Sequence, residues 1–241
     1  MESINFKEKL YSAFKQNNLD GLLDDQKADK LYELYNTLVE TNKTFNLTAI
    51  TDENDVILKH FVDCAAVLAY IPQDSSIIDV GCGAGFPCLP IAILRDDVMI
   101  TPLDSTAKKI GFIKSTAEKL DLRNITPIAS RAEEYALKSR ETFDVAISRA
   151  VARLNILDEL CIPFVKVGGR FIAMKSSKGE EEYTEAQNGI INLGCALKQK
   201  ETFDFSFENI EITREIYVFE KKSQTPKQYP RNYSQISKKP L

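Results

Sequence analysis

Three glycines at alternate positions form the part of this sequence with the clearest chemical consequence. Residues 77–90 read IIDVGCGAGFPCLP, in which Asp79 lies within an apolar run and Gly81, Gly83 and Gly85 follow it. Glycine has no Cβ and adopts positive φ readily, so a ligand can lie directly against the main chain. Three interpretations are open at this point: a nucleotide pyrophosphate site, a site for a different cofactor, and a tight structural turn.

The glycine spacing separates the candidate cofactors. A dinucleotide fingerprint is Gly-x-Gly-x-x-Gly, whereas here Phe86 occupies the place of its third glycine. The spacing Asp-x-Gly-x-Gly-x-Gly resembles the first motif of methyltransferases that use S-adenosylmethionine (SAM). SAM carries an amino group and a sulfonium, both cationic, and the carboxylate of Asp79 suits such a neighbour. Asp104 ends the next predicted strand, 19 residues after Gly85, where a carboxylate can accept both ribose hydroxyls.

The elements that must position these residues follow from the pattern after residue 76. Short apolar strands are predicted at 76–80, 99–104, 125–130, 143–148 and 169–175. Helices are predicted between them at about 88–95, 106–120 and 153–165, and then at about 179–191. Two closing segments, 196–206 and 214–222, read as an antiparallel pair. Alternating strands and helices predict βαβ units, and hence an α/β, doubly wound, Rossmann-like sheet of seven strands, mostly parallel, with the last pair antiparallel.

Three regions are predicted along the chain. Residues 1–70 form an N-terminal helical cap, in which Leu31, Leu34 and Leu38 follow the spacing of one apolar helix face. Residues 71–222 form the cofactor-binding domain. Residues 223–241 form a basic tail: from Lys221 onward the chain has six Lys and Arg and no acidic residue, so the net charge of −4 leaves −10 for residues 1–220. Such segregation favours an arm that contacts phosphate.

Composition excludes several classes of protein. The hydrophobic fraction of 44% is that of a globular chain, and no apolar stretch is long enough to cross a bilayer. The first ten residues carry charges, so there is no signal-peptide core. Five cysteines without a Cys-x-x-Cys, and a single His, predict neither a disulfide framework nor a metal site. We therefore expect a cytoplasmic protein, a monomer, with no membrane or metal partner.

The region after the fourth predicted strand indicates the kind of methyl acceptor. It reads SRAVARL, whereas methylation of an adenine amino group usually uses an Asn/Asp-Pro-Pro-aromatic motif there. Cys88 lies in the glycine loop and so does not suit attack on a pyrimidine carbon. An acceptor with an in-plane lone pair, such as guanine N7, needs no general base, only alignment and electrostatics. Arg149 immediately follows this strand. Its position is equally compatible with contact to the ligand and with capping of the strand end.

Several longer motifs together match one family. In chain order they are FNLTAIT, LKHFVDC, DVGCGAGFPCLPIAI, LDSTAKKIGFI, SRAEE, SRAVARL, GGRFIAMK and the terminal YPR and KKPL. The chain resembles the 16S rRNA guanine-N7 methyltransferases, the glucose-inhibited division protein B family, over nearly its whole length. The resemblance implies a SAM-dependent enzyme that forms 7-methylguanosine at position 527 of 16S rRNA, with that rRNA, or the small ribosomal subunit or its precursor, as partner.

The resemblance also implies roles for individual residues. The expected SAM-binding residues are Asp79, Gly81, Gly83, Gly85, Phe86, Asp104, Ser105, Ala132, Glu133 and Arg149. Ala132 and Glu133 are expected at the adenine, and Asp104 at the ribose. The expected catalytic residues are Arg149 and Lys175. The expected RNA-binding residues are Arg131, Lys175, Arg214, Lys227, Arg231, Lys238 and Lys239. His60 is assigned a structural role.

Other expectations come from the tail and from competing functions. Ser234 and Ile236 stand where the family has Gly and Pro, which leaves the tail conformation open. Deleting residues 223–241 is expected to weaken RNA binding and to spare SAM binding. The alternatives are a methyltransferase acting on another RNA or on a small molecule, a non-catalytic module that binds SAM and RNA, and a nicotinamide dehydrogenase.

Overall fold

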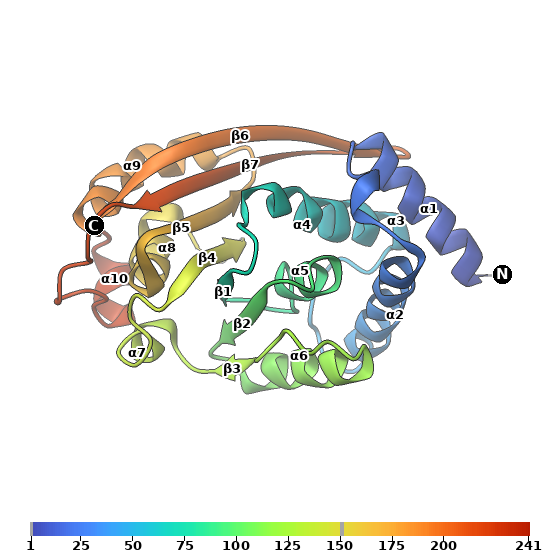
Figure 1. The fold of residues 1–241 in the computed structure, drawn as a ribbon, viewed down its shortest axis with the longest axis horizontal. Coiled ribbons are helices and arrows are strands. Elements are labelled where there is room, and N and C mark those ends of the chain that lie inside the picture. Colours follow the sequence, from blue (N-terminus) through green and yellow to red (C-terminus); the bar gives the residue numbers. More distant parts are fainter. Residues whose placement is uncertain (1, 150–151) are drawn as a thin grey trace.

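The computed structural model describes residues 2–149 and 152–241, which contain one seven-stranded sheet (Figure 1). The strands lie in the order β3-β2-β1-β4-β5-β7-β6. Their bounds are β1 (Ser76–Val80), β2 (Met99–Asp104), β3 (Ile128–Ala129), β4 (Phe143–Arg149), β5 (Val165–Lys175), β6 (Cys195–Phe207) and β7 (Ile210–Lys221). The strands from β3 to β5 pair in parallel, and β7 runs antiparallel to both β5 and β6. The predicted fold class is confirmed.

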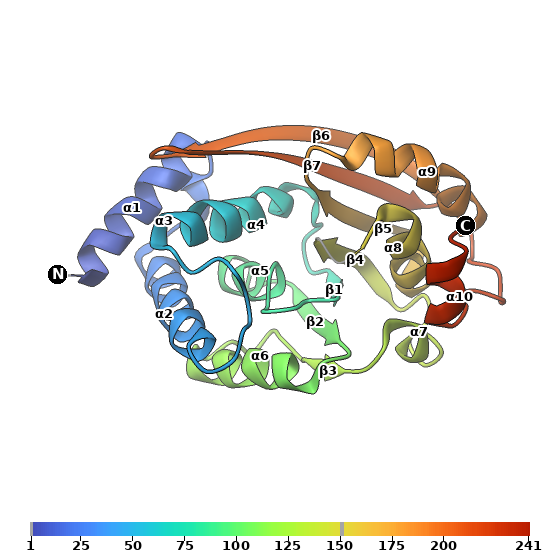
Figure 2. The same cartoon turned by 180° about the vertical axis from the view of Figure 1, so that it is seen from behind.

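Helices cover both faces of the sheet, as the two opposite views show (Figures 1 and 2). The N-terminal helices are α1 (Glu2–Gln16), the 3₁₀ turn η1 (Asp20–Leu22), α2 (Asp25–Asn42), α3 (Glu53–Val56), the π-helical turn η2 (Ile57–Val62), α4 (Asp63–Ala66) and the 3₁₀ turn η3 (Val67–Tyr70). The helices that follow are α5 (Cys88–Leu94), α6 (Ala107–Lys119), α7 (Ala132–Tyr135), α8 (Leu154–Cys161), the 3₁₀ turn η4 (Ile162–Phe164), α9 (Gly179–Asn192) and α10 (Tyr233–Lys238). No helix in the described part of the chain has the length and apolarity of a membrane span.

Alternation along the strands divides the interior into two cores. Successive side chains of a strand point to opposite faces, so Ile77 joins the core under α1, α2, α5 and α6, while Ile78 joins the core under α8 and α9. In β5, Ile172 and Ala173 divide in the same way. Strands buried on both faces read as continuous apolar runs, which is why residues 76–80 and 143–148 were recognisable as strands.

The edge of the sheet departs from the prediction at β3. The predicted strand 125–130 reduces to Ile128–Ala129 and one isolated bridge between Ile100 and Ile125. The main-chain N and O of Ile100 bond to this edge segment, so by alternation the nitrogen of Pro102 faces the same side. Proline has no N–H to donate, and the pairing is interrupted there.

The order of the strands locates the crevice where ligands bind. From β1 the chain passes through α5 to β2, which pairs with β1 on one side. The strand β4, which comes later in the chain, pairs with β1 on the opposite side. This reversal makes a topological switch point beyond the carboxyl ends of β1 and β4. The helical segment from Glu53 to Tyr70 lies beside this crevice. Its central turn η2 has π geometry, a form that is frequent at functional sites.

The basic tail packs against the domain. Arg231 forms a salt bridge of 2.6 Å with Glu159, a residue that is fully buried on α8. Ile236 on α10 is also fully buried and joins the core beside α8. Asn232 caps α10 by accepting a hydrogen bond from the main-chain N–H of Gln235 at 3.1 Å. Ile236, which departs from the family pattern, therefore anchors this segment.

We expect Arg231→Ala to lower the free energy of unfolding by about 3 kcal/mol, because it leaves the buried Glu159 carboxylate without its cation. Urea denaturation followed by circular dichroism measures the change. Lys238→Ala is the matched control, since this side chain is exposed on α10 and its removal should cost less than about 0.5 kcal/mol. Equal effects of the two substitutions would contradict a structural role for the Arg231–Glu159 pair.

Candidate functional site

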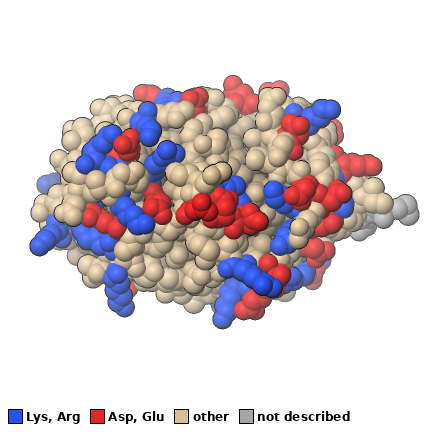
Figure 3. Space-filling model, viewed as in Figure 1, with Lys and Arg blue, Asp and Glu red and all other residues tan. Residues whose placement is uncertain are grey.

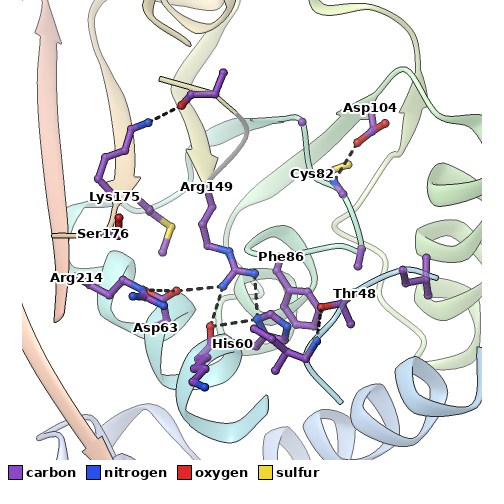
Figure 4. A pocket seen from close by; sticks show the side chains of 18 of the residues that line it. Thr48, His60, Asp63, Cys82, Phe86, Asp104, Arg149, Lys175, Ser176 and Arg214 are labelled. Carbon is purple, nitrogen blue, oxygen red and sulfur yellow. Dashed lines mark hydrogen bonds and ion pairs between the residues drawn. The ribbon is translucent and has the colours of Figure 1, made fainter. Parts of the chain in front are cut away.

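A cavity of about 730 Å³ lies between the carboxyl ends of the central strands and the helical cap (Figure 4). The glycine loop after β1 and the ends of β4 and β5 form one side of it, and the segment η2–α4 forms another. Side chains on its wall include Lys59, His60, Asp63, Phe86, Asp104, Lys109, Arg149, Lys175 and Arg214. Of the residues predicted for the site, the cavity therefore brings together Gly81, Gly83, Phe86, Asp104, Arg149, Lys175 and Arg214.

Asp104 holds the glycine loop in place. Its Oδ2 accepts a hydrogen bond from the main-chain N–H of Gly83 at 3.1 Å, and its Oδ1 accepts one from Thr106 at 2.8 Å. Gly83 has φ of 56°, a conformation that side chains disfavour. The side chain of Asp104 is only 10% exposed, and the ammonium of Lys109 is its nearest cation, at 3.9 Å. Asp104 thus presents a carboxylate with fixed orientation to the cavity.

Two of the predicted cofactor residues, Gly85 and Asp79, are absent from the cavity walls and shape the loop itself. A Cβ on Gly85 would come within 2.4 Å of the Leu89 side chain, so this glycine permits α5 to pack closely. Asp79 is fully buried, and its Oδ2 accepts the N–H of Cys88 at the start of α5 at 3.1 Å. Burial raises the pKa of Asp79 to about 7. Asp79 therefore supports the loop from beneath, and its direct contact with the cofactor stays a prediction.

A second, smaller cavity of about 300 Å³ shares Gly81 and Asp104 with the first. Its wall contains the predicted residues Ser105, Ala132 and Glu133, together with Ser130, Arg131, Leu160 and Tyr233. Arg131 pairs with Glu133 at 2.7 Å. The carboxylate of Asp104 therefore stands at the boundary between two hollows, one on the side of β4 and one on the side of β3.

A buried charge network closes the floor of the larger cavity (Figure 4). The guanidinium of Arg149 donates to Asp63 Oδ2 at 3.1 Å and to the carbonyl of Lys59 at 2.9 Å. Arg214, from β7, pairs with the same oxygen of Asp63 at 3.3 Å. The Arg149 guanidinium also lies 5.5 Å from the ring centroid of Phe86. One carboxylate thus contacts two arginines that come from β4 and β7, strands that are far apart in sequence.

His60 is a neutral member of this network. Its ring stacks on Phe86 with centroids 4.1 Å apart, and its Nδ1 lies 3.1 Å from Nη2 of Arg149. Burial and the charge of Arg149 lower the pKa of His60 to about 3. Nδ1 also lies 3.1 Å from the carbonyl oxygen of Lys59, so it either donates to that oxygen or accepts from Arg149, depending on which ring nitrogen carries the proton. Nε2 is buried without a hydrogen-bond partner among the described residues.

Comparison with known proteins gives the family. A sequence model of the family described as rRNA small subunit methyltransferase G matches residues 27–209. A protein of that name from Staphylococcus carnosus (strain TM300) is 45% identical over 92% of this chain and 94% of its own length. One from Clostridium botulinum (strain ATCC 19397 / Type A) is 42% identical over 96% of this chain and 97% of its own. The chain belongs to this family.

Solved structures of lower identity share the fold. A precorrin-6y C5,15-methyltransferase from Geobacter metallireducens GS-15 superposes with a TM-score of 0.52 at 16% identity, covering 73% of this chain and 92% of that one. TYW2 from M. jannaschii gives 0.52 at 14% identity, covering 67% and 76%. At these identities the likeness shows the Rossmann-like methyltransferase fold, in agreement with the strand order.

In this member of the rRNA methyltransferase G family, Lys175 has a contact different from the one predicted. Its ammonium donates to the carbonyl of Ala152 at 2.7 Å and pairs with Glu182 at 2.7 Å, and the residue is 5% exposed. Glu182 also accepts the N–H of Leu154. Lys175 therefore holds Ala152 directly and Leu154 through Glu182, and its roles in catalysis and RNA binding stay predictions. Ala150 and Val151 of the SRAVARL motif lie outside the described residues.

The other predicted RNA-binding residues fall into two groups. Lys227, Lys238 and Lys239 are exposed on the tail, so they are free to contact a partner. Arg231 pairs with the buried Glu159, as described above, and its role in RNA binding stays a prediction. Arg131 lies at the rim of the smaller cavity and Arg214 on the wall of the larger one.

Several contributors to the site were not predicted, among them Lys59, His60 as a cavity residue, Asp63, Lys109 and Tyr233. His60 and Asp63 both occur in the LKHFVDC motif, three residues apart, which places them on one face of a helix. That spacing is the signal that could have found Asp63. Nothing in the sequence indicated that Tyr233, in the tail, would line a cavity.

Proposed function

We propose that this protein transfers the methyl group of SAM to N7 of a guanine in 16S rRNA, the guanine at position 527. The observation that carries the proposal is the pair of cavities that meet at Asp104, in a chain of the rRNA methyltransferase G family. The enzyme class follows from the family. The cofactor, the acceptor atom and the roles of individual residues are proposals from the geometry.

The residues of the two cavities fit SAM. An adenosine with an attached amino acid is an elongated ligand with its ribose in the middle, and Asp104 stands where the two cavities meet. Its carboxylate has lone pairs left beyond the two main-chain N–H groups it accepts, so it can accept ribose hydroxyls. Ala132 and Glu133 would then flank the adenine, while Gly81 and Gly83 would lie along the amino acid portion. TYW2, which shares the fold, was solved in complex with AdoMet.

When bound, SAM supplies a methyl group on a sulfonium, which a neutral nucleophile can accept. The major-groove edge of guanine presents N7 beside the acceptor O6. N7 carries its lone pair in the ring plane, so the protein needs no base to remove a proton. The stacked rings of His60 and Phe86 lie on the cavity wall, where they can contact the acceptor base. In this proposal Arg149 orients His60 and Phe86 and adds positive potential.

Exposed cations are proposed to hold the RNA. Basic side chains gather at the left end of the face in Figure 3, the end that carries the tail in Figure 1, and acidic ones gather near its centre. Lys227, Lys238 and Lys239 belong to the exposed basic set of the tail. Phosphate contacts of this kind release counterions, so affinity falls as salt rises. A ribosomal RNA substrate implies that the reaction occurs in the cytoplasm.

The proposal is tested by mapping methylated bases on 16S rRNA from cells with and without this protein. We expect one 7-methylguanosine to disappear when the protein is removed and to return when it is supplied again. An identical methylation map in both strains, or loss of a modification on a different base, would contradict the proposed acceptor.

A further inference from the structure

The C-terminal tail contributes an aromatic side chain to the smaller cavity. Tyr233, the first residue of α10, lines this cavity together with Asp104 and Glu133. It is 39% exposed, unlike the buried aromatic side chains of the core. The guanidinium of Arg131 lies 5.1 Å from its ring centroid, and the same arginine pairs with Glu133. The ring is thus held at the rim of a hollow, with part of its surface uncovered.

The position of this ring is fixed by the tail's own anchors. Arg231, two residues earlier, is bound to buried Glu159, and Ile236, three residues later, is fully buried. Asn232 directly precedes Tyr233 and caps α10. These contacts lie on both sides of Tyr233, so the ring has a defined place relative to β2 and α7 and is prearranged for a ligand.

We propose that Tyr233 forms one wall of the adenine subsite, which makes the tail part of the cofactor site. The inference rests on the proposed function, because it takes SAM as the ligand that spans both cavities. With the ribose at Asp104 and the amino acid portion in the larger cavity, the base lies in the smaller one, where Tyr233 offers the aromatic surface. Aromatic rings stack on any base through their faces. The earlier expectation that removing residues 223–241 spares SAM binding is therefore reversed.

The effect on affinity is measured by calorimetry with SAM and with S-adenosylhomocysteine. Tyr233→Ala is expected to weaken both ligands by about tenfold, the size of one lost base–aromatic stack. The two losses should be equal, because the ligands share their adenosine. Tyr233→Phe keeps the ring and should bind as the unmodified chain does. Gln235→Ala, an exposed change on the same helix at a residue absent from both cavity walls, is the control and should leave both affinities unchanged.

A spectroscopic test is available because the chain has no tryptophan. Tyr233→Trp places a single indole at the rim of the cavity. Its emission should change on titration with S-adenosylhomocysteine, with the same Kd as calorimetry gives. Leu197→Trp is the matched control: Leu197 is a partly exposed residue on the edge strand β6 and is absent from both cavity walls. Its emission should stay constant.

The outcomes distinguish this inference from the function on which it rests. If Asp104→Ala weakens SAM binding while Tyr233→Ala does not, the adenine wall is wrong and the cofactor site stands. If the unmodified chain does not bind SAM, both proposals are overturned. If Tyr233→Ala leaves SAM affinity unchanged and weakens RNA binding, the ring belongs to the RNA surface, which also overturns the inference.

Discussion

Asp104→Ala is expected to raise the Kd for SAM by about 100-fold. A hydrogen bond to a charged group is worth about 1.5–3 kcal/mol, and in the cofactor site proposed above Asp104 accepts two ribose hydroxyls. The substitution also removes the acceptor for the N–H of Gly83, at 3.1 Å, that holds the glycine loop. Both losses act on the cofactor, so affinity should fall even where the chain remains folded. Calorimetry measures the affinity, and the thermal unfolding midpoint reports the fold.

Two further variants separate the sources of this loss. Asp104→Asn keeps an oxygen for the loop but removes the charge, so its Kd should lie between those of the unmodified chain and Asp104→Ala. Asp204→Ala removes an exposed carboxylate on β6, and it should leave SAM binding unchanged. An Asp104→Ala protein that binds SAM as tightly as the unmodified chain would eliminate the ribose assignment.

Asp63→Ala is expected to lower the free energy of unfolding by about 3–5 kcal/mol. Asp63 is 3% exposed and is the carboxylate that both Arg149 and Arg214 contact. Removing it leaves two guanidinium groups close together without this counterion. Arg149 would then lose its fixed position against His60 and Phe86, so methyl transfer should also fall. Urea denaturation gives the stability, and a methyl-transfer assay at low temperature gives the activity of the folded fraction.

Comparison with an exposed pair shows whether burial is the cause. Glu40→Ala breaks the surface pair of Glu40 and Lys43, whose side chains are 74% and 65% exposed, and it should cost less than about 0.5 kcal/mol. Arg214→Ala should cost less than Asp63→Ala, because Asp63 keeps Arg149. Equal stabilities of the Asp63→Ala and Glu40→Ala proteins would show that the network contributes little to the fold.

Most of the sheet was predictable because strands that are buried on both faces have continuous apolar sequences. Residues 76–80 and 143–148 are apolar on both faces, and the glycines that follow β1 mark its end. The length of β3 was not predictable. Pro102 on the neighbouring strand lacks the N–H that would bond to this edge segment, and the sequence does not show that the nitrogen of Pro102 faces β3. β5 begins at Val165, earlier than the predicted 169, because its pairing with β4 shifts register between Phe143 and Val145.

The site was predictable where chemistry is local in sequence and not where it is assembled by packing. The glycine loop follows β1, and Asp104 and Arg149 are the last residues of β2 and β4. The parallel sheet brings these strand ends together. The network of His60, Asp63 and Arg149 depends on a π-helical turn, which no periodicity indicated. The sequence also did not show which ionisable side chains are buried. Asp79 is buried beneath the glycine loop, and Lys175 is buried with its ammonium bound to Ala152 and Glu182.

The central claim is methyl transfer to guanine N7 through the site at Asp104. It is tested most directly with the purified protein, radiolabelled SAM and 16S rRNA from cells lacking the protein, supplied both as free RNA and as small ribosomal subunits. After digestion to nucleosides, we predict label in 7-methylguanosine for the unmodified chain with at least one of these substrates, and strongly reduced label for Asp104→Ala at the same SAM concentration. Label in another nucleoside, no label with either substrate, or equal label with Asp104→Ala would contradict the account.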